Sequence, residues 1–389
     1  MSQSSIKLES SAAIRPGVVP CEGLHYLISK GAIEGTALVK KDVGPSAFDL
    51  HLTNRAWKVG GGIKGRSNID YSQVIHSQEF GFEKIDISRA FLLEPKNTYV
   101  IELEERLSLK NYPNIVGIAT GKSSIGRLDV LTRLICDRSE LYDSVPSYND
   151  HKCDELHLYV EVSPITFGIL VKSGVSLNQL RLFIGDPSYS RIGSSHLQYF
   201  GNLLLDRDGN PINDVVKLER LSVNLTPDPK IGKNAVAFHA KSKVKDPIDL
   251  TSSKLKPDPK KYWDTEKLKG NESLYDGVLE IKPNHFYIIR SNERLHLPAD
   301  IAVYCQAMSE SLGEIRVHYA GFAHPHFGNR VGGTPLIFEV RGHNVTTYLR
   351  HDEVLARLEY YRMSLPTGPD SSKYEEQELK LSSKFEDWN

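Results

Sequence analysis

The sequence has few cysteines, no excess charge of either sign and no long apolar run. The four cysteines are Cys21, Cys136, Cys153 and Cys305, and their wide spacing fits a reducing compartment better than a disulfide framework. A formal net charge of -1 over 389 residues gives no general attraction to nucleic acid or to a membrane surface. No segment has the apolar length of a membrane span, and the first residues lack the apolar core of a secretory signal. We therefore expect a cytoplasmic protein that binds neither nucleic acid nor membrane, so that any polyanionic ligand is held by a local site.

The sequence also lacks a convincing set of zinc ligands. Zinc-dependent nucleobase deaminases carry His-x-Glu followed by Pro-Cys-x-x-Cys, and no two cysteines of this chain have that spacing. His324 and His326 are separated only by a proline and have no Cys or acidic residue beside them, which makes them a weak ligand set. Any deaminase built from this chain would therefore activate water without zinc.

The most informative pattern that is present is an internal repeat. Glu161 and Glu339 each stand within an apolar, strand-like run, and they are 178 residues apart. The pattern Glu-Arg-Leu-x-Leu likewise occurs twice, at residues 105–109 and 293–297. In a chain of 389 residues, a period near 180 predicts two similar domains.

Most of the remaining sequence has the pattern of short β-strands, bounded by Gly, Pro, Asn or Asp. The clearest strand segments are residues 47–52, 99–103, 156–160, 180–184, 278–281, 286–289, 315–319 and 336–340. One short amphipathic helix is predicted over residues 20–31. The sequence therefore predicts a mainly β protein with a few short helices.

Composition suggests where the two domains begin and end. We predict a first domain over residues 1–190, a second over 191–365 and a C-terminal tail over 366–389, which is too polar for a core. Residues 241–270 are rich in Lys, Asp and Pro and are expected to form a long surface loop.

Residues 121–127, with the sequence GKSSIGR, are a candidate phosphate site. They combine two cations, two hydroxyls and two glycines, so that several donors can converge on phosphate oxygens while glycine lets the backbone approach. The segment is not a Walker A loop, because Lys122 lacks the preceding Gly-x-x-x-x-Gly. An ordinary charged turn is the alternative interpretation.

The repeated glutamates are candidate acid/base residues. A carboxylate that is partly buried in a strand has a raised pKa, which suits proton transfer. The alternatives are a side chain that faces solvent or pairs with a neighbouring Arg, and duplication could equally preserve a structural ion pair. Residues 319–328 are expected to form a hairpin whose small residues let a flat ring lie against the backbone.

With these features the chain resembles the dCTP deaminases of the dUTPase-like superfamily, in the double-length form found in some bacteria. Residues 122–127 follow the family's Arg-Ser-Ser-x-x-Arg phosphate motif, with Lys122 in place of the first Arg. Both strand glutamates resemble the catalytic Glu, and Ala320 and His324 occupy places comparable to the family's base-binding hairpin. Residues 373–377 reproduce the Lys-Tyr-x-x-Gln tail that closes over the nucleotide. The resemblance implies two tandem dUTPase-like domains, each a distorted β-barrel or jelly roll.

The two halves differ in ways that predict one composite site. The second-half counterpart of the phosphate motif, residues 308–314, has lost both cations and gained carboxylates. The first half, in turn, has a long insertion where the base hairpin should be. We therefore expect the phosphate motif of the first half to meet Glu339 and the hairpin of the second, with the tail over both. Glu161 is the rival to Glu339 for the catalytic role, and the reverse assignment stays open.

The resemblance also implies substrate, chemistry and assembly. The expected reaction is hydrolytic deamination of dCTP to dUTP and ammonia in pyrimidine deoxynucleotide synthesis, with Mg²⁺ carried by the triphosphate and no metal site on the protein. Expected catalytic residues are Glu339 or its rival Glu161, Arg127 and Ser123. Expected substrate-binding residues are Lys122, Ser123, Ser124, Arg127, Ala320, His324, Lys373, Tyr374 and Gln377.

Three further expectations follow from the same resemblance. A homotrimer or a hexamer is expected, because dUTPase-like sites normally use three domains around an axis, and dTTP is an expected effector. The alternative functions are a dUTP diphosphatase, alone or combined with deamination, and a non-catalytic nucleotide-binding regulator.

Overall fold

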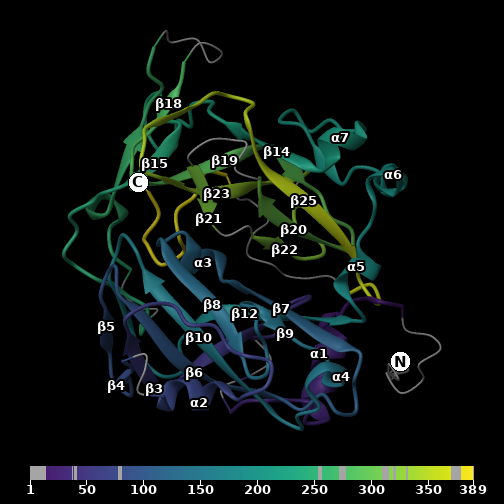
Figure 1. Ribbon diagram of the computed structural model, residues 1–389. Coiled ribbons are helices and arrows are strands. Elements are labelled where there is room, and N and C mark those ends of the chain that lie inside the picture. The colour runs from purple at the N-terminus through teal and green to yellow at the C-terminus, as the bar shows by residue number, and fades with distance from the viewer. Residues whose placement is uncertain are drawn as a thin grey trace.

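The computed structural model describes residues 15–36, 38, 42–77, 81–252, 256–270, 277–308, 315–318, 321–329, 332–368 and 378–388 of the chain. Strands make up 41% and helices 12% of the structure, which confirms the prediction of a mainly β protein. Each half of the chain forms a barrel-like sheet, and Figure 1 shows the first half, in purple and blue, below the second half, in green and yellow.

The sheet of the first half contains ten strands among the described residues. Its main path runs β8 (Val130–Cys136), β10 (Leu156–Pro164), β6 (Thr98–Leu107), β3 (Phe48–Val59), β12 (Ser176–Ile184), β7 (Ile115–Gly121) and β9 (Ser144–Val145). Three short strands extend it, namely β1 (Gly17–Val18), β2 (Ile33–Glu34) and β4 (Glu83–Asp86). All of these pairs are antiparallel.

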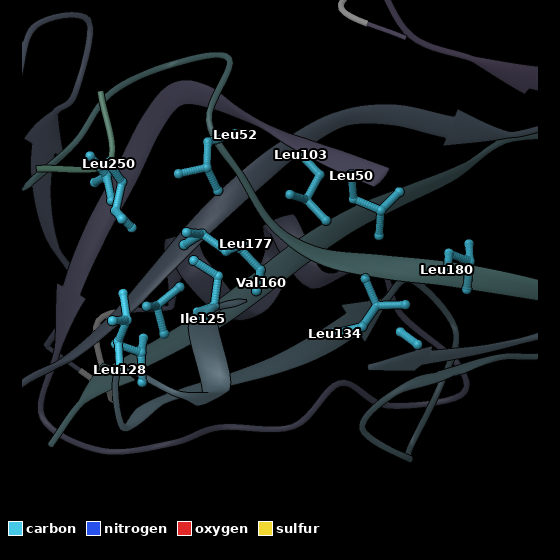
Figure 2. Close-up of a cluster of buried hydrophobic side chains, with 14 of the residues drawn as sticks. Leu50, Leu52, Leu103, Ile125, Leu128, Leu134, Val160, Leu177, Leu180 and Leu250 are labelled. Carbon is cyan, nitrogen blue, oxygen red and sulfur yellow. The ribbon is translucent and has the colours of Figure 1, made fainter. Parts of the chain in front are cut away.

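Every second side chain of β10 is buried in the core, and this alternation determines the face on which Glu161 lies. Leu158, Val160 and Val162 are fully buried in the core of the first half, and Figure 2 shows Val160 among leucines of neighbouring strands, including Leu103. Because successive side chains of a strand point to opposite faces, Glu161 lies on the outer face of this barrel.

The sheet of the second half also has ten strands within the described ranges. Its main path runs β17 (Trp263–Glu266), β15 (Ala237–Ala240), β19 (Phe286–Leu295), β14 (Arg220–Asn224), β25 (Val354–Arg362), β20 (Ile301–Ala307) and β22 (Phe322–Ala323). Off this path, β13 (Leu204–Leu205) and β23 (Thr334–Gly342) pair with β19, and β21 (Ile315–His318) pairs with β23. Phe338 and Val340 of β23 face the second-half core, so Glu339 also lies on the outer face of its own barrel.

The helices are short. The α-helices of the described residues are α1 (Cys21–Ser29), α2 (Tyr71–His76), α3 (Ser123–Gly126), α4 (Tyr148–His151), α5 (Pro187–Ser190), α6 (Ser194–Leu197) and α7 (Val215–Leu218). Helix α1 lies within the range predicted for a helix from the sequence. In the part of the chain that the structure describes, no helix has both the length and the hydropathy needed to cross a bilayer.

The first residue of the repeated Glu-Arg-Leu-x-Leu pattern makes similar hydrogen bonds in both halves. The carboxylate of Glu105 accepts the backbone N–H of His51 at 2.8 Å and lies 2.7 Å from its Nδ1. The carboxylate of Glu293 accepts the backbone N–H and the hydroxyl of Ser222, both at 2.7 Å. Each glutamate therefore ties its strand to a neighbouring strand.

The prediction of a long surface loop over residues 241–270 is wrong. This segment contains β16 (Ile248–Asp249), which pairs in parallel with β11 (Ile169–Val171) of the first half. β11 in turn pairs with β5 (Phe91–Leu93). Trp263 is 1% exposed and packs against Phe167 of the first half. Pairing and an aromatic anchor thus make this polar segment part of the contact between the halves.

The prediction that the tail is too polar for a core is also wrong over residues 378–388. Leu379, Leu381 and Phe385 are buried in the hydrophobic cluster that contains the first-half core. Burying a Leu or Phe side chain contributes about 1.5–3 kcal/mol to the free energy of unfolding. Burial of these three side chains therefore holds the tail in the core although the residues between them are polar.

Candidate active site

The turn at residues 122–127 holds the candidate phosphate donors in a fixed geometry. The backbone N–H groups of Ile125 and Gly126 donate to the carbonyl of Lys122 at 2.8 and 3.0 Å. Ile125 is fully buried and anchors the turn in the first-half core, as Figure 2 shows. Ser123 and Ser124 are half-buried at the start of α3, so their positions are set by a packed helical turn.

Glu339 of the second half meets this turn directly. A Cβ atom built on Gly126 would lie 2.3 Å from Oε2 of Glu339 and 2.9 Å from its Oε1. Figure 1 shows the elements concerned, with α3 at the boundary just below β21 and β23. Only a glycine at position 126 permits this approach, because any side chain would overlap the carboxylate.

The environment of Glu339 favours its protonated form. Burial raises the pKa of this carboxyl well above its usual range, the charge of Asp129 raises it further, and Arg127 opposes the shift. Oε2 of Glu339 has no hydrogen-bond partner among the described residues. A buried, unpaired carboxylate oxygen is costly, and such groups are typical of sites that bind and transfer protons.

The described part of the tail lies on the phosphate motif. Nη1 of Arg127 donates to the carbonyls of Lys380 and Leu381 at 3.3 and 3.4 Å. The hydroxyl of Ser382 donates to the carbonyl of Ser124 at 2.5 Å. The expected tail residues Lys373, Tyr374 and Gln377 lie outside the described residues.

Cations from three parts of the chain gather at the Lys122 end of the motif. Lys122 forms an ion pair with Asp49 of β3. The pKa of Lys384 is lowered, first by burial and then by the charges of Lys122 and Lys256, while Asp49 opposes the shift. This end of the turn therefore carries concentrated positive charge, which fits an anionic ligand.

Glu161 has a different environment, supplied by its own half. Its Oε2 accepts the hydroxyl of Tyr142 at 2.7 Å and the backbone N–H of Ile63 at 3.2 Å. A Cβ atom on Gly62 would lie 2.8 Å from both carboxylate oxygens. The carboxylate of Glu161 is thus hydrogen-bonded to a first-half loop and Tyr142 rather than to the phosphate motif.

The described part of the predicted hairpin contains both histidines. Nδ1 of His324 lies 2.7 Å from the carbonyl of Pro325, and its ring meets Phe327 edge-on at 5.9 Å. Nε2 of His326 lies 3.2 Å from the carbonyl of Thr367. Both rings contact backbone oxygens, and Ala320 lies outside the described residues.

Three charged residues at the site were missed from the sequence: Asp49, Asp129 and Arg341. Asp129 and Arg341 form an ion pair of 2.5 Å between the halves. A sequence signal existed, because each stands two positions after a candidate catalytic residue, Arg127 or Glu339. Asp49 offers no such signal, since only the pairing of β3 brings it to Lys122.

Comparison with known proteins gives one consistent result. The model of the N-terminal domain of 2′-deoxycytidine 5′-triphosphate deaminase matches residues 15–186, and the model of the C-terminal domain matches residues 195–385. A crystal structure of 2′-deoxycytidine 5′-triphosphate deaminase from Agrobacterium tumefaciens is similar in fold, with a TM-score of 0.76 and 27% identity. That match covers 90% of this chain and 97% of the other. A search of curated proteins found no match.

Proposed function

The chain belongs to the 2′-deoxycytidine 5′-triphosphate deaminase family, and from this premise we propose that it hydrolyses dCTP to dUTP and ammonia without zinc. The observation that supports this most strongly is the contact of Glu339 with Gly126. It brings the carboxyl of Glu339, whose Oε2 has no hydrogen-bond partner among the described residues, from one half to the phosphate motif of the other.

In the proposed reaction, Glu339 and a hydroxyl of the motif, such as that of Ser123, hold a water molecule against the ring carbon that bears the exocyclic amine. The water oxygen forms a bond to this carbon while Glu339 takes one proton and passes it to the adjacent ring nitrogen. The second water proton goes to the amine, the C–N bond breaks, and ammonia leaves. Both protons of water are thus used, one in dUTP and one in ammonia.

The raised pKa of Glu339 suits this role, because a carboxylate with a raised pKa is a stronger base than an ordinary one and accepts a proton from water more readily. Arg127 adds a buried positive charge beside Glu339 and the reacting base. Preorganised donors of this kind contribute about 3 kcal/mol each to transition-state stabilisation.

The triphosphate would lie along the turn, with Lys122, Ser123, Ser124 and Arg127 as donors. Mg²⁺ is proposed to arrive on the nucleotide, because this ion binds through phosphates and retained waters. In this proposal the contacts of the ion are to the phosphate oxygens. The ion would neutralise phosphate charge and fix the shape of the triphosphate.

Lys373, Tyr374 and Gln377 would close over the nucleotide, while Ala320 and His324 would border the base. Self-association as a homotrimer or hexamer, dTTP as effector and a cytoplasmic location in pyrimidine deoxynucleotide synthesis complete the proposal. Light scattering, with and without dTTP, tests the assembly.

Product analysis tests the function. The purified protein is incubated with dCTP, CTP or dUTP, and ammonia, dUTP and pyrophosphate are measured. Ammonia and dUTP from dCTP support deamination. Pyrophosphate from dUTP would identify a diphosphatase, and saturable dCTP binding without either product would identify a regulator.

A further inference from the structure

A buried ion pair crosses between the halves beside Glu339. Nη1 of Arg341 lies 2.5 Å from Oδ2 of Asp129, and the two side chains are 16% and 0% exposed. The hydroxyl of Thr166 donates to the same Oδ2 at 2.5 Å. Nη2 of Arg341 donates to the carbonyl of Asn284 at 2.9 Å. The pair is therefore held from both sides.

The backbone of Asp129 is also unusual. Its φ angle is 57°, in the left-handed region that glycine adopts most easily, and an aspartate there carries strain. Burial raises the pKa of Asp129 to about 6, and the charge of Arg341 and the hydrogen bond from Thr166 oppose this rise. A strained, buried and charged residue needs compensation, and Arg341 supplies it.

Asp129 lies next to the phosphate turn, and Arg341 lies on β23, the strand that carries Glu339. Asp129 follows Arg127 by two residues, and its backbone N–H donates to the carbonyl of Gly126 at 2.9 Å. Arg341 follows Glu339 by two residues on β23, so both side chains lie on the same outer face. The ion pair thus fixes the position of β23 along the phosphate turn.

The other copy of the repeat lacks this device. The residue 178 positions before Arg341 is Ser163, whose hydroxyl lies 2.9 Å from that of Thr98 within the same half. Glu161, two residues earlier, is bonded to Tyr142 and a first-half loop. The cation two residues after the repeated glutamate is therefore present after Glu339, which meets the phosphate motif, and absent after Glu161.

We propose that the Asp129–Arg341 ion pair is a positioning clamp that holds Glu339 at its reacting distance from the phosphate turn, an inference that rests on the proposed deaminase function. Neither residue touches the substrate in this account. Loosening the clamp lets the carboxyl move, and a displacement of 1 Å can cost on the order of 100-fold in rate.

Kinetics of three variants test the clamp. Asp129→Asn keeps the shape and tolerates the left-handed backbone but removes the charge. Arg341→Met removes the cation, and Arg341→Lys restores it. We expect kcat for dCTP deamination to fall about 10- to 100-fold in the first two variants, with KM changed less than threefold, and Lys to recover part of kcat.

The double variant Asp129→Asn/Arg341→Met should be no slower than the slower single variant, because the two residues act as a unit. Glu293→Gln is the matched control, since it removes a buried carboxylate that is hydrogen-bonded to Ser222 and not to Asp129 or Arg341. It should lower stability without changing kcat. Unchanged kcat in folded Asp129→Asn and Arg341→Met would overturn the clamp, as would additive losses in the double variant.

Hydrogen exchange separates this inference from the proposed function. In Asp129→Asn we expect faster exchange of the Ile125 and Gly126 amides and of β23 amides, whereas Glu293→Gln should leave the Ile125 and Gly126 amides unchanged. If the wild-type protein releases no ammonia, the proposed function fails, and the clamp is then judged by exchange alone. Unchanged exchange at both elements would overturn it.

Discussion

Replacing Gly126 by alanine gives the sharpest structural test of the contact between the halves. The added Cβ would lie 2.3 Å from Oε2 of Glu339, and ordinary contact begins at 3.4 Å, so the carboxyl must move by about 1 Å. A shift of this size predicts a loss of about 100-fold in kcat. Overpacking should also lower the free energy of unfolding by about 1–3 kcal/mol.

Gly62→Ala is the matched control, because its Cβ would lie 2.8 Å from both oxygens of Glu161. It imposes the same kind of clash on the rival glutamate. Ammonia release from dCTP and thermal unfolding are measured for both variants. We expect Gly62→Ala to lose stability and keep kcat within about threefold, well short of the loss expected for a displaced catalytic group.

Shortening the glutamate should relieve the clash, so that Gly126→Ala/Glu339→Asp has a higher free energy of unfolding than Gly126→Ala. The reasoning is refuted if folded Gly126→Ala retains full kcat. It is refuted equally if Gly62→Ala is the variant that loses turnover.

Three further predictions concern stability and binding. The pKa of Glu339 is higher in the folded protein than in the unfolded chain. Its contribution to the free energy of unfolding is therefore fully present below the unfolded pKa of about 4.3, where the carboxyl is protonated in both states. This contribution is lost as pH rises through the folded pKa. Glu339→Gln should therefore raise Tm over wild type more at pH 9 than at pH 5, and an equal difference at both pH values would contradict this. Lys122→Ala should raise KM for dCTP about tenfold or more, because a charge-assisted hydrogen bond contributes about 1.5–3 kcal/mol, while the exposed Lys110→Ala should leave KM unchanged. Phe385→Ala should lower the free energy of unfolding by about 3–5 kcal/mol in urea titrations, and a loss below about 1 kcal/mol would show that the tail is not part of the core.

The β architecture could be predicted because strand alternation is a local property. The apolar residues on either side of Glu161 in β10 and of Glu339 in β23 recur every second position, and this period predicts strands. The repeat predicts two similar β domains, and the resemblance implies that each is a barrel; the structure has two barrel-like sheets. The resemblance to the dCTP deaminases, carried by residues 122–127 and the strand glutamates, is confirmed as well.

What covers each outer face could not be predicted from period or composition. Glu161 is covered by a loop of its own half, and Glu339 by α3 of the other half. The segment around Trp263 and the tail around Phe385 are likewise buried by contacts with distant parts of the chain, which period and composition do not show. In each case a large apolar side chain packs against an aromatic ring that is distant in the sequence: Trp263 contacts Phe167 of the first half, and Phe385 of the tail contacts Trp263.

The most direct test of the account compares Glu339→Gln with Glu161→Gln. Glutamine keeps the size of the side chain but cannot carry the proton between water and the base. Ammonia release and dCTP binding by calorimetry are measured on both variants. The account predicts that Glu339→Gln binds dCTP and releases no ammonia, while Glu161→Gln deaminates at nearly the wild-type rate. An active Glu339→Gln together with an inactive Glu161→Gln would contradict it.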